Sequence, residues 1–245
     1  MSVKYREEII GGQRLVLADC LEYLPTINGL DCFLTDPFYG VNGGKGGQAR
    51  DHGKAKYEQA FEDTPEEVLR VAVAAVSTCM RICQRGAVTP GSKCFQLYPQ
   101  AADIGCFWSP STPAVGPWGF TSFHPILYYG RDYRAGIGAW PTGKQLVPDR
   151  EKNGHPCPKP IGAWSWLLQK VSQEGETVLD PFMGSGTTLV ACEQLGRSGI
   201  GIEISPTYFD IACKRVEKAA LQPRLQLVEQ TPVPKTQTLV FSGDQ

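Results

Sequence analysis

Short apolar runs alternate with helical stripes along this chain of 245 residues. The runs at residues 31–35, 124–129, 177–180 and 201–204 are typical of strands buried on both faces. Apolar residues spaced three or four apart predict helices between and after these runs. The stripes are Val68, Ala72, Val76, Cys79 and Cys83, then Ile161, Trp164, Leu168 and Val171, then Phe209, Ala212, Cys213 and Val216. Strands that alternate with helices predict an α/β protein with a mostly parallel sheet.

Turn and capping residues set the boundaries of further elements. Residues 6–17 surround Gly11-Gly12 and predict a β-hairpin, after which Asp19 opens a short helical stretch. Thr64-Pro65-Glu66-Glu67 is a capping box with proline at the first helical position. The first striped helix is therefore expected to begin there and to run to about Cys83.

The middle of the chain has weaker patterns. We expect short strands at 86–89 and 93–97, followed by an irregular segment over residues 98–122 that is rich in proline, glycine, serine and aromatic residues. Long irregular segments in compact domains are usually functional. The last residues, 231–245, have no apolar period, so they are expected to form a loosely ordered tail.

An acid followed by a glycine turn and a helix stands at residues 177–188, which read Thr-Val-Leu-Asp-Pro-Phe-Met-Gly-Ser-Gly-Thr-Thr. Gly184 and Gly186 allow the backbone to approach a ligand closely. The helix that begins at about Thr187 directs free N–H groups at the same place. A G-x-G turn alone is equally consistent with an ordinary strand-to-helix connection.

Two acids refine this site. Glu203 ends the next predicted strand, at an offset typical of an acid that accepts from ribose hydroxyls. Asp180, directly before the turn, suits a cationic ligand better than a pyrophosphate. The chain also lacks the G-x-x-x-x-G-K-[ST] pattern, which argues against a triphosphate site.

A second acid turn follows the strand at 31–35 and reads Asp36-Pro37-Phe38-Tyr39-Gly40. Ligands of open α/β sheets bind at the carboxyl ends of the strands. If the strands before Asp36 and Asp180 are parallel neighbours, both acids therefore face the same crevice.

Charge confines any nucleic-acid surface to part of the chain, because the formal net charge is −1. Residues 40–56 are rich in glycine and basic residues, and a second, mildly basic loop runs from Arg131 to Lys152. Both segments are consistent with contact to a phosphate backbone, and the first is also consistent with a solvated loop. The candidate contacts are Lys45, Arg50, Lys54, Lys56, Arg131 and Arg134.

Composition points to a cytoplasmic protein. The N-terminus carries no signal-peptide pattern, and no apolar run approaches the roughly 20 residues of a membrane span. The nine cysteines are scattered without a C-x-x-C pair, so we expect free thiols and no metal site.

Four segments together resemble a known family, the S-adenosylmethionine-dependent amino-methyltransferases of DNA in their permuted, β-group form. Residues 36–39 stand where that family has D-P-P-Y, and residues 155–160 match its H-P-x-x-K-P. Residues 180–188 match its D-P-F-x-G-S-G-T-T, and residues 201–203 match its G-I-E. The compact spacing looks like the small orphan or phage-borne members, which places the protein in a bacterial or phage-infected cell.

The resemblance implies a Rossmann-like methyltransferase fold, with a doubly wound and mostly parallel sheet and a circularly permuted motif order. Residues 1–230 would form a single catalytic domain. Residues 40–56 and about 98–150 would be DNA-facing loops that include the target-recognition insert. The implied partner is duplex DNA, bound by a monomer or a homodimer.

The resemblance also implies roles around the cofactor, S-adenosylmethionine. Asp180 would take its ammonium group, Glu203 its ribose hydroxyls and Asp19 its adenine amine. Lys159, next to Pro160, would meet its carboxylate, although a solvated lysine at a helix start is the alternative. The turn that packs on its amino-acid moiety would comprise Phe182, Gly184, Ser185, Gly186 and Thr187.

The same resemblance assigns the chemistry to residues 36–39. Asp36 and the carbonyl of Pro37 would accept hydrogen bonds from an exocyclic base amine, and Tyr39 would stack on the extruded base. In this family an acid at the first position goes more often with adenine-N6 transfer, and serine more often with cytosine-N4 transfer. We therefore expect adenine, with cytosine as the alternative.

Phe38 departs from the family, which has a second proline at this position. A proline fixes φ, whereas phenylalanine loosens the turn and adds a ring near the target pocket. A weakly active or non-catalytic protein that binds cofactor and DNA is therefore a competing hypothesis. A small-molecule methyltransferase is more remote, because the basic glycine-rich loop would then lack a purpose.

Overall fold

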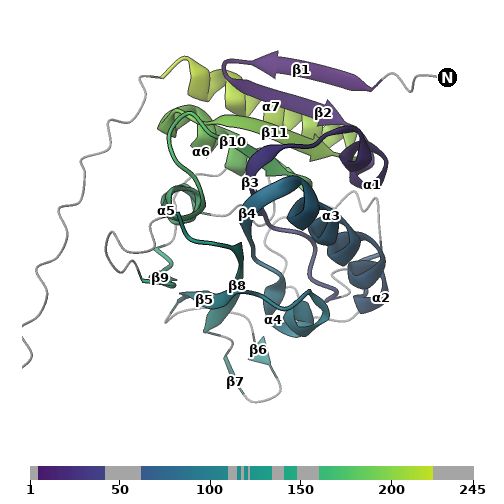
Figure 1. Ribbon diagram of the computed structural model, residues 1–245, viewed down its shortest axis with the longest axis vertical. Coiled ribbons are helices and arrows are strands. Elements are labelled where there is room, and N and C mark those ends of the chain that lie inside the picture. The colour runs from purple at the N-terminus through teal and green to yellow at the C-terminus, as the bar shows by residue number, and fades with distance from the viewer. Residues whose placement is uncertain are drawn as a thin grey trace, which may run out of the picture.

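A mixed β-sheet runs through the computed structural model of this chain, which describes residues 5–41, 62–109, 115–116, 119–120, 122–133, 141–147 and 160–222. Within these residues the sheet has nine strands in the order β1-β2-β11-β10-β3-β4-β8-β5-β9 (Figure 1). Five of its eight neighbouring strand pairs are parallel. The strands are β1 (Arg6–Ile10), β2 (Gln13–Leu17), β3 (Leu30–Thr35), β4 (Cys83–Val88), β5 (Asp103–Trp108), β8 (Phe123–Gly130), β9 (Lys144–Gln145), β10 (Thr177–Asp180) and β11 (Ser198–Glu203).

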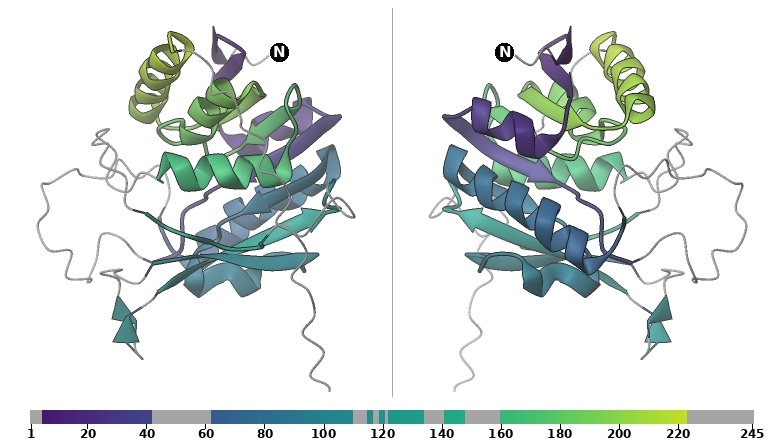
Figure 2. Two further views of the ribbon diagram at one scale, coloured as in Figure 1. Left: turned by 90° about the vertical axis from the view of Figure 1, so that its left-hand side faces the viewer. Right: turned by 90° about the vertical axis from the view of Figure 1, so that its right-hand side faces the viewer.

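Helices cover both faces of this sheet (Figure 2). A separate two-stranded ribbon pairs β6 (Val115–Gly116) with β7 (Gly119–Phe120). The helices are α1 (Cys20–Tyr23), α2 (Pro65–Glu67), α3 (Ala74–Ile82), α4 (Gly91–Cys94), α5 (Ile161–Val171), α6 (Thr187–Leu195) and α7 (Pro206–Ala220). A π-helical stretch (Val68–Val73) joins α2 to α3, and 3₁₀ turns (Leu24–Thr26 and Phe95–Leu97) extend α1 and α4.

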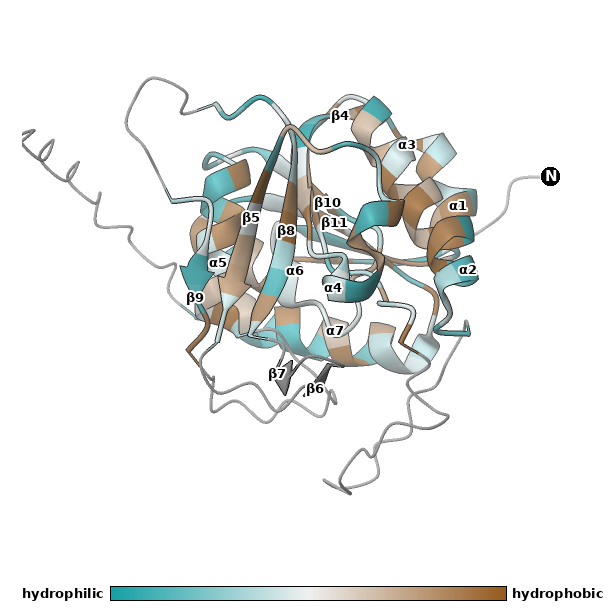
Figure 3. Cartoon of the chain, turned by 90° about the horizontal axis from the view of Figure 1, so that it is seen from below, coloured by the Kyte–Doolittle hydropathy of each residue, from teal (hydrophilic) through white to brown (hydrophobic). Residues whose placement is uncertain are grey.

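The central strands are apolar on both sides because each side faces a different helical layer. In β3, Phe33 packs in the cluster with α1 and α3, whereas Cys32 and Leu34 pack in the cluster with α5 and α6. On β10, Leu179 packs in the cluster with α1 and α3, and the neighbouring Val178 packs in the cluster with α5 and α6. Figure 3 shows α5 on one side of the strands and α1 and α3 on the other. The predicted α/β architecture with a mostly parallel sheet is confirmed.

The strand order reverses between β3 and β10. The chain passes from β3 to β4 on one side, and from β10 to β11 on the other. The two strands are parallel neighbours, with Val178 opposite Cys32 and Leu179 opposite Phe33. Such a reversal is the topological switch point at which doubly wound sheets bind ligands. The Asp36 and Asp180 turns begin at the carboxyl ends of these two strands.

The predicted helix boundaries follow the capping residues. The hydroxyl of Thr64 accepts from the backbone N–H of Glu67 at 3.2 Å, and that of Ser205 accepts from Tyr208 at 3.4 Å. Gly196 ends α6 in the left-handed region, at φ 72°. These positions agree with the capping and stop signals in the sequence.

The predicted strand at 93–97 is wrong, because this segment forms α4 and the 3₁₀ turn after it. Both edges of β4 already pair with β3 and β8, so the segment has no free edge of that strand to join. The strand predicted at 86–89 exists, but it begins earlier, at Cys83.

The prediction that residues 98–122 are irregular is also wrong, since they contain β5 and the ribbon of β6 and β7. β5 pairs with β8 over six residues, from Asp103 opposite Tyr128 to Trp108 opposite Phe123. Its apolar signal is weak because Asp103, Ile104 and Trp108 are exposed. An antiparallel strand near a sheet edge needs only one buried face.

Several predictions fall outside the described residues: most of the basic loop at 40–56, the segment at 155–159 and the tail at 231–245. Where cysteines are described, all eight are free thiols. No helix within the described ranges has the length and apolarity needed to span a bilayer.

Candidate active site

Asp36 lies directly after β3, and two hydroxyl groups donate to one of its carboxylate oxygens. The Tyr39 hydroxyl and the Thr89 hydroxyl each lie 2.5 Å from Asp36 Oδ1. Asp36 and Tyr39 are partly exposed, whereas Pro37 is buried. The Tyr39 ring packs against Gly91, where an added Cβ would lie 2.7 Å from Tyr39 Cγ. Thr89 and Gly91 therefore shape the first acid turn from the neighbouring strand end.

Asp180 is 2% exposed and is held inside the protein. Its Oδ1 accepts from the Thr35 hydroxyl at 2.7 Å and from the Phe182 backbone N–H at 3.1 Å. Its Oδ2 accepts from the Thr188 hydroxyl at 2.5 Å, and that hydroxyl accepts in turn from Trp164 Nε1 at 2.8 Å. The carboxylate thus ties the glycine turn to β3 and α5.

Burial is the main reason that the pKa of Asp180 is raised to about 6. The hydrogen bonds to Thr188, Thr35 and the Phe182 N–H oppose this shift, and the nearby Asp36 carboxylate adds to it. These donors leave acceptor capacity on Oδ2, because a carboxylate oxygen can accept more than one hydrogen bond. The contact between Asp180 and the ammonium group of the cofactor remains a prediction.

The glycine turn needs left-handed backbone at Gly184 (φ 54°) and Gly186 (φ 82°). Glu203 braces it, because its Oε2 accepts from the Gly184 N–H at 2.8 Å and its Oε1 from the Ser205 N–H at 2.8 Å. Burial, opposed by these backbone donors, raises the pKa of Glu203 to about 6. Glu203 thus lies beside the turn, as the sequence predicts for a ribose-binding acid.

Arg215 of α7 holds the same turn from the other side. Its Nη1 donates to the Ser185 carbonyl at 2.5 Å, to the Ser185 hydroxyl at 2.9 Å and to the Thr187 hydroxyl at 3.2 Å. The sequence motifs do not identify Arg215 as a site residue, because it belongs to none of them. Ser185 and Thr187 are consequently buried and engaged by the protein itself.

The two acid turns touch through aromatic side chains. The rings of Phe38 and Phe182 form an edge-on pair, with centroids 6.1 Å apart and planes at 83°. Phe38 therefore takes part in the contact between the turn that begins at Asp36 and the turn that begins at Asp180. This is a packing role that the family's second proline would not provide.

Asp19 lies at the same edge of the sheet, next to Glu203. The backbone N–H of Ala18 donates to the Glu203 carbonyl at 2.9 Å. The Asp19 side chain caps α1 by accepting from the Leu21 N–H at 2.8 Å. Pro160, partly buried, directly precedes α5.

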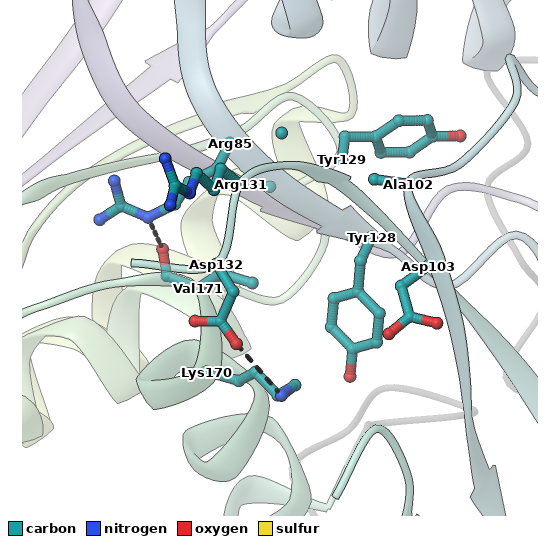
Figure 4. Close-up of a pocket in the computed structure, with 11 residues that line it drawn as sticks. Arg85, Ala102, Asp103, Tyr128, Tyr129, Arg131, Asp132, Lys170 and Val171 are labelled. Atoms are coloured by element: carbon teal, nitrogen blue, oxygen red, sulfur yellow. Dashed lines mark hydrogen bonds and ion pairs between the residues drawn. The ribbon is translucent and has the colours of Figure 1, made fainter. Parts of the chain in front are cut away.

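Arg131 is not brought to this site. It follows β8, which is antiparallel to β4, so it lies at the edge of the sheet opposite Asp36. Figure 4 shows Arg131 beside Arg85 in a pocket at that edge, where Lys170 pairs with Asp132 at 3.7 Å. The prediction that Arg131 contacts DNA would therefore require a DNA surface away from the Asp36 turn. Lys45, Arg50, Lys54, Lys56, Arg134 and Lys159 lie outside the described residues.

Comparison with known proteins agrees with this geometry. A family model for N6/N4 methyltransferases, described as DNA methylase, matches residues 108–214. The type II methyltransferase M.HindIII of Haemophilus influenzae is 30% identical over 123 residues, which cover 38% of this chain and 40% of that protein. M.HpaI of Haemophilus parainfluenzae is 41% identical over 69 residues, which cover 28% and 22%. The chain thus spans 22% to 40% of the length of these curated relatives.

Solved structures share the fold over most of the chain. The PvuII DNA methyltransferase, which is cytosine-N4-specific, matches with a TM-score of 0.62 and 15% identity, over 86% of this chain and 91% of that one. The complex of M1.HpyAVI with SAM matches with a TM-score of 0.59 and 18% identity, over 83% and 98%. These likenesses establish a methyltransferase fold. Together with the motifs and the match to the family model over residues 108–214, they support an S-adenosylmethionine-dependent amino-methyltransferase.

Proposed function

We propose that this protein transfers a methyl group from S-adenosylmethionine to the exocyclic N6 amine of an adenine in duplex DNA. The observation that carries the proposal is the position of the two acid turns on β3 and β10, which flank the switch point of the sheet. The contact between Phe38 and Phe182 joins the turns, so that a bound methyl donor and a target base would be neighbours. Nine of the described strands form one continuous sheet, which supports a single catalytic domain over residues 1–230.

The residues beside the glycine turn fit the cofactor. An added Cβ at Gly184 would meet nothing nearer than the Phe182 carbonyl at 4.0 Å, so this stretch of backbone faces open space. The Glu203 carboxylate accepts from the backbone N–H groups of Gly184 and Ser205, and a carboxylate can accept a further donor such as a ribose hydroxyl. Bound S-adenosylmethionine supplies an electrophilic methyl group on a positively charged sulfur.

In this proposal Asp180 takes the ammonium group of the cofactor and also holds the glycine turn. Its buried carboxylate fixes Phe182 and Thr188 at the two ends of the turn, and Arg215 fixes Ser185 and Thr187 between them. The backbone at Gly184, which faces open space, then packs on the amino-acid moiety of the cofactor. Asp19, Lys159 and Pro160 keep the cofactor roles that the family resemblance implies.

Asp36 carries the chemistry by positioning the target amine. That nitrogen is a poor nucleophile because its lone pair is delocalised into the base. Hydrogen bonds to Asp36 and to the Pro37 carbonyl would draw it toward sp³ geometry and aim its lone pair at the methyl group. A hydrogen bond to a charged acceptor is worth about 1.5–3 kcal/mol, which is roughly one to two decades of rate if expressed in the transition state.

The base must leave the DNA stack to reach this crevice, at a cost of a few kcal/mol. Stacking on Tyr39 would return about 1–3 kcal/mol. Lys45, Arg50, Lys54 and Lys56 remain the proposed phosphate contacts, because they follow the Asp36 turn closely in the chain. We leave Arg131 out of this proposed set because it lies at the opposite edge of the sheet.

Cytosine-N4 transfer is the second candidate, and it is supported by the fold shared with the cytosine-N4-specific PvuII enzyme. The acid at the first position of the catalytic motif favours adenine. DNA incubated with the protein and S-adenosylmethionine, then digested to nucleosides and analysed by mass spectrometry, distinguishes the two. N6-methyladenine supports the proposal, and N4-methylcytosine alone replaces it with the second candidate.

A further inference from the structure

Thr89 is a buried residue whose hydroxyl lies beside the Asp36 turn. It belongs to none of the sequence motifs. It is 1% exposed and lies directly after β4, the strand next to β3. Its hydroxyl donates to Asp36 Oδ1 at 2.5 Å, and its backbone N–H donates to the Thr35 carbonyl at 3.1 Å. Both its side chain and its backbone are thus bonded to consecutive residues at the end of β3.

We propose that Thr89 is a positioning residue that fixes the orientation of the Asp36 carboxylate toward the target amine. This inference rests on the proposed function, in which Asp36 accepts a hydrogen bond from that amine. Rotation of the carboxylate about its Cβ–Cγ bond would move Oδ1 away from the Thr89 hydroxyl. A hydrogen bond of this short, charge-assisted kind resists such rotation. The carboxylate is therefore oriented before the base arrives, rather than by the base.

Thr89 is better suited to this task than Tyr39, the other donor to Asp36 Oδ1. Tyr39 is partly exposed, and in the proposed function its ring also stacks on the extruded base. Thr89 is buried and anchored by its backbone, and it contacts no ligand in the proposal, so its hydroxyl stays at Asp36. A single fixed donor then maintains the carboxylate orientation during transfer.

The same contacts connect Asp36 to the cofactor turn. Thr35 accepts from the Thr89 N–H through its carbonyl and donates to Asp180 Oδ1 through its hydroxyl at 2.7 Å. Hydrogen bonds thus link the ends of β4, β3 and β10 in one row. Thr89 therefore sets the Asp36 carboxylate relative to the turn that would hold the methyl donor.

The experiment compares single-turnover methyl transfer at saturating S-adenosylmethionine and DNA by wild type, Thr89→Val and Thr89→Ser. Valine keeps the shape and removes the donor, so we expect the transfer rate to fall roughly tenfold, as for one lost charge-assisted hydrogen bond. Serine keeps the donor, so its rate should lie within about twofold of wild type. Affinities for S-adenosylmethionine and DNA should change by less than about twofold in both variants, because Thr89 contacts neither ligand in the proposal.

Ser172→Ala is the matched control. Ser172 is fully buried and lies beyond the end of α5, away from the Asp36 turn; its hydroxyl donates to the Leu168 carbonyl at 2.7 Å and accepts from Arg197 Nε at 3.3 Å. Its loss should lower the melting temperature about as much as Thr89→Val without changing the transfer rate. A melting-temperature loss shared by both variants, with a rate loss in only one, separates positioning from general destabilisation.

Three results overturn the positioning role. They are an unchanged rate in Thr89→Val, a serine variant as slow as the valine variant, and a rate loss matched by an equal loss of cofactor affinity. If the valine variant does not fold, Thr89→Ala replaces it in the same comparison. A wild-type protein that binds both ligands and transfers no methyl group overturns the proposed function itself, whereas an active wild type with equally active Thr89 variants overturns only this inference.

Discussion

Phe38 forms part of the contact between the two acid turns, which gives a physical reason for a ring at this position. Its edge-on pair with Phe182 contributes about 0.5–1.5 kcal/mol beyond the burial of the two rings. The structure therefore favours a packing role for this departure from the D-P-P-Y pattern over a loss of function.

Replacement of Phe38 by proline tests this view. We expect the wild type to be active already, and Phe38→Pro to change the transfer rate by less than about tenfold, because Asp36, Pro37 and Tyr39 are unchanged. The variant should unfold at a lower temperature because it loses the aromatic pair. Methyl incorporation and thermal unfolding are measured on both proteins. Activity in the proline variant alone would favour the non-catalytic reading of the natural chain.

At the residue scale, the sequence predicts the positions of Asp36, Asp180 and Glu203 because each ends a strand beside a turn. It does not predict how their hydrogen-bonding capacity is used. The hydroxyl groups of Thr35 and Thr188 donate hydrogen bonds to Asp180. The hydroxyl of Thr89, which follows another strand, donates to Asp36. These pairings depend on strand neighbours that are far apart in sequence, so no local pattern encodes them.

Among the elements, the turn into α4 is shaped by one glycine. Gly91 has φ 71°, and a Cβ there would lie 2.7 Å from the Tyr39 ring. Gly91→Ala should displace that ring from Asp36 and lower the transfer rate about tenfold or more, with cofactor affinity nearly unchanged.

Gly29→Ala is the control for backbone strain. Gly29 has a similar φ of 68°, and nothing lies within 4 Å of its added Cβ. Both alanines should cost similar stability, about 1 kcal/mol, for the left-handed conformation. Chemical unfolding and transfer rates are measured for both. Equal rates in the two variants would show that the contact between Gly91 and Tyr39 has no part in activity.

The elements predicted correctly from sequence are those with strong periodicity or capping signals, such as β3, β10, α5 and α7. The misread ones lack such signals. Residues 93–97 have the apolar spacing of a short strand, and only the occupied edges of β4 exclude it. The sequence does not reveal β5, because its exposed side chains interrupt any apolar run. It also contains Gly105, which weakens the strand signal and is needed because an added Cβ would overlap the Thr142 carbonyl.

For the whole molecule, the buried Asp180 makes stability depend on pH. Its pKa is raised to about 6 in the folded protein, above the usual aspartate value of 3.8. Between these values the folded state holds a proton that the unfolded state has released. The free energy of unfolding therefore falls as pH rises through this window, by up to about 1 kcal/mol per pH unit.

Asp180→Asn removes this titration. The unfolding free energy of wild type minus that of the variant should decrease as pH rises from about 4 to about 6, and should level off above it. Urea unfolding at several pH values measures this difference. A difference that is constant, or that grows with pH, would mean that burial does not dominate at this carboxylate. Asp36 and Glu203 are common to both proteins, so their direct contributions cancel to first order.

The central claim concerns the whole fold: Asp36 and Asp180, 180 − 36 = 144 positions apart in the chain, begin adjacent turns at one switch point. The most direct test is mass spectrometry of nucleosides from DNA treated with deuterium-labelled S-adenosylmethionine and either wild type or Asp36→Ala. We predict labelled N6-methyladenine from wild type and none from Asp36→Ala, which should bind the cofactor within about threefold of wild type. Undiminished transfer by Asp36→Ala would contradict the account.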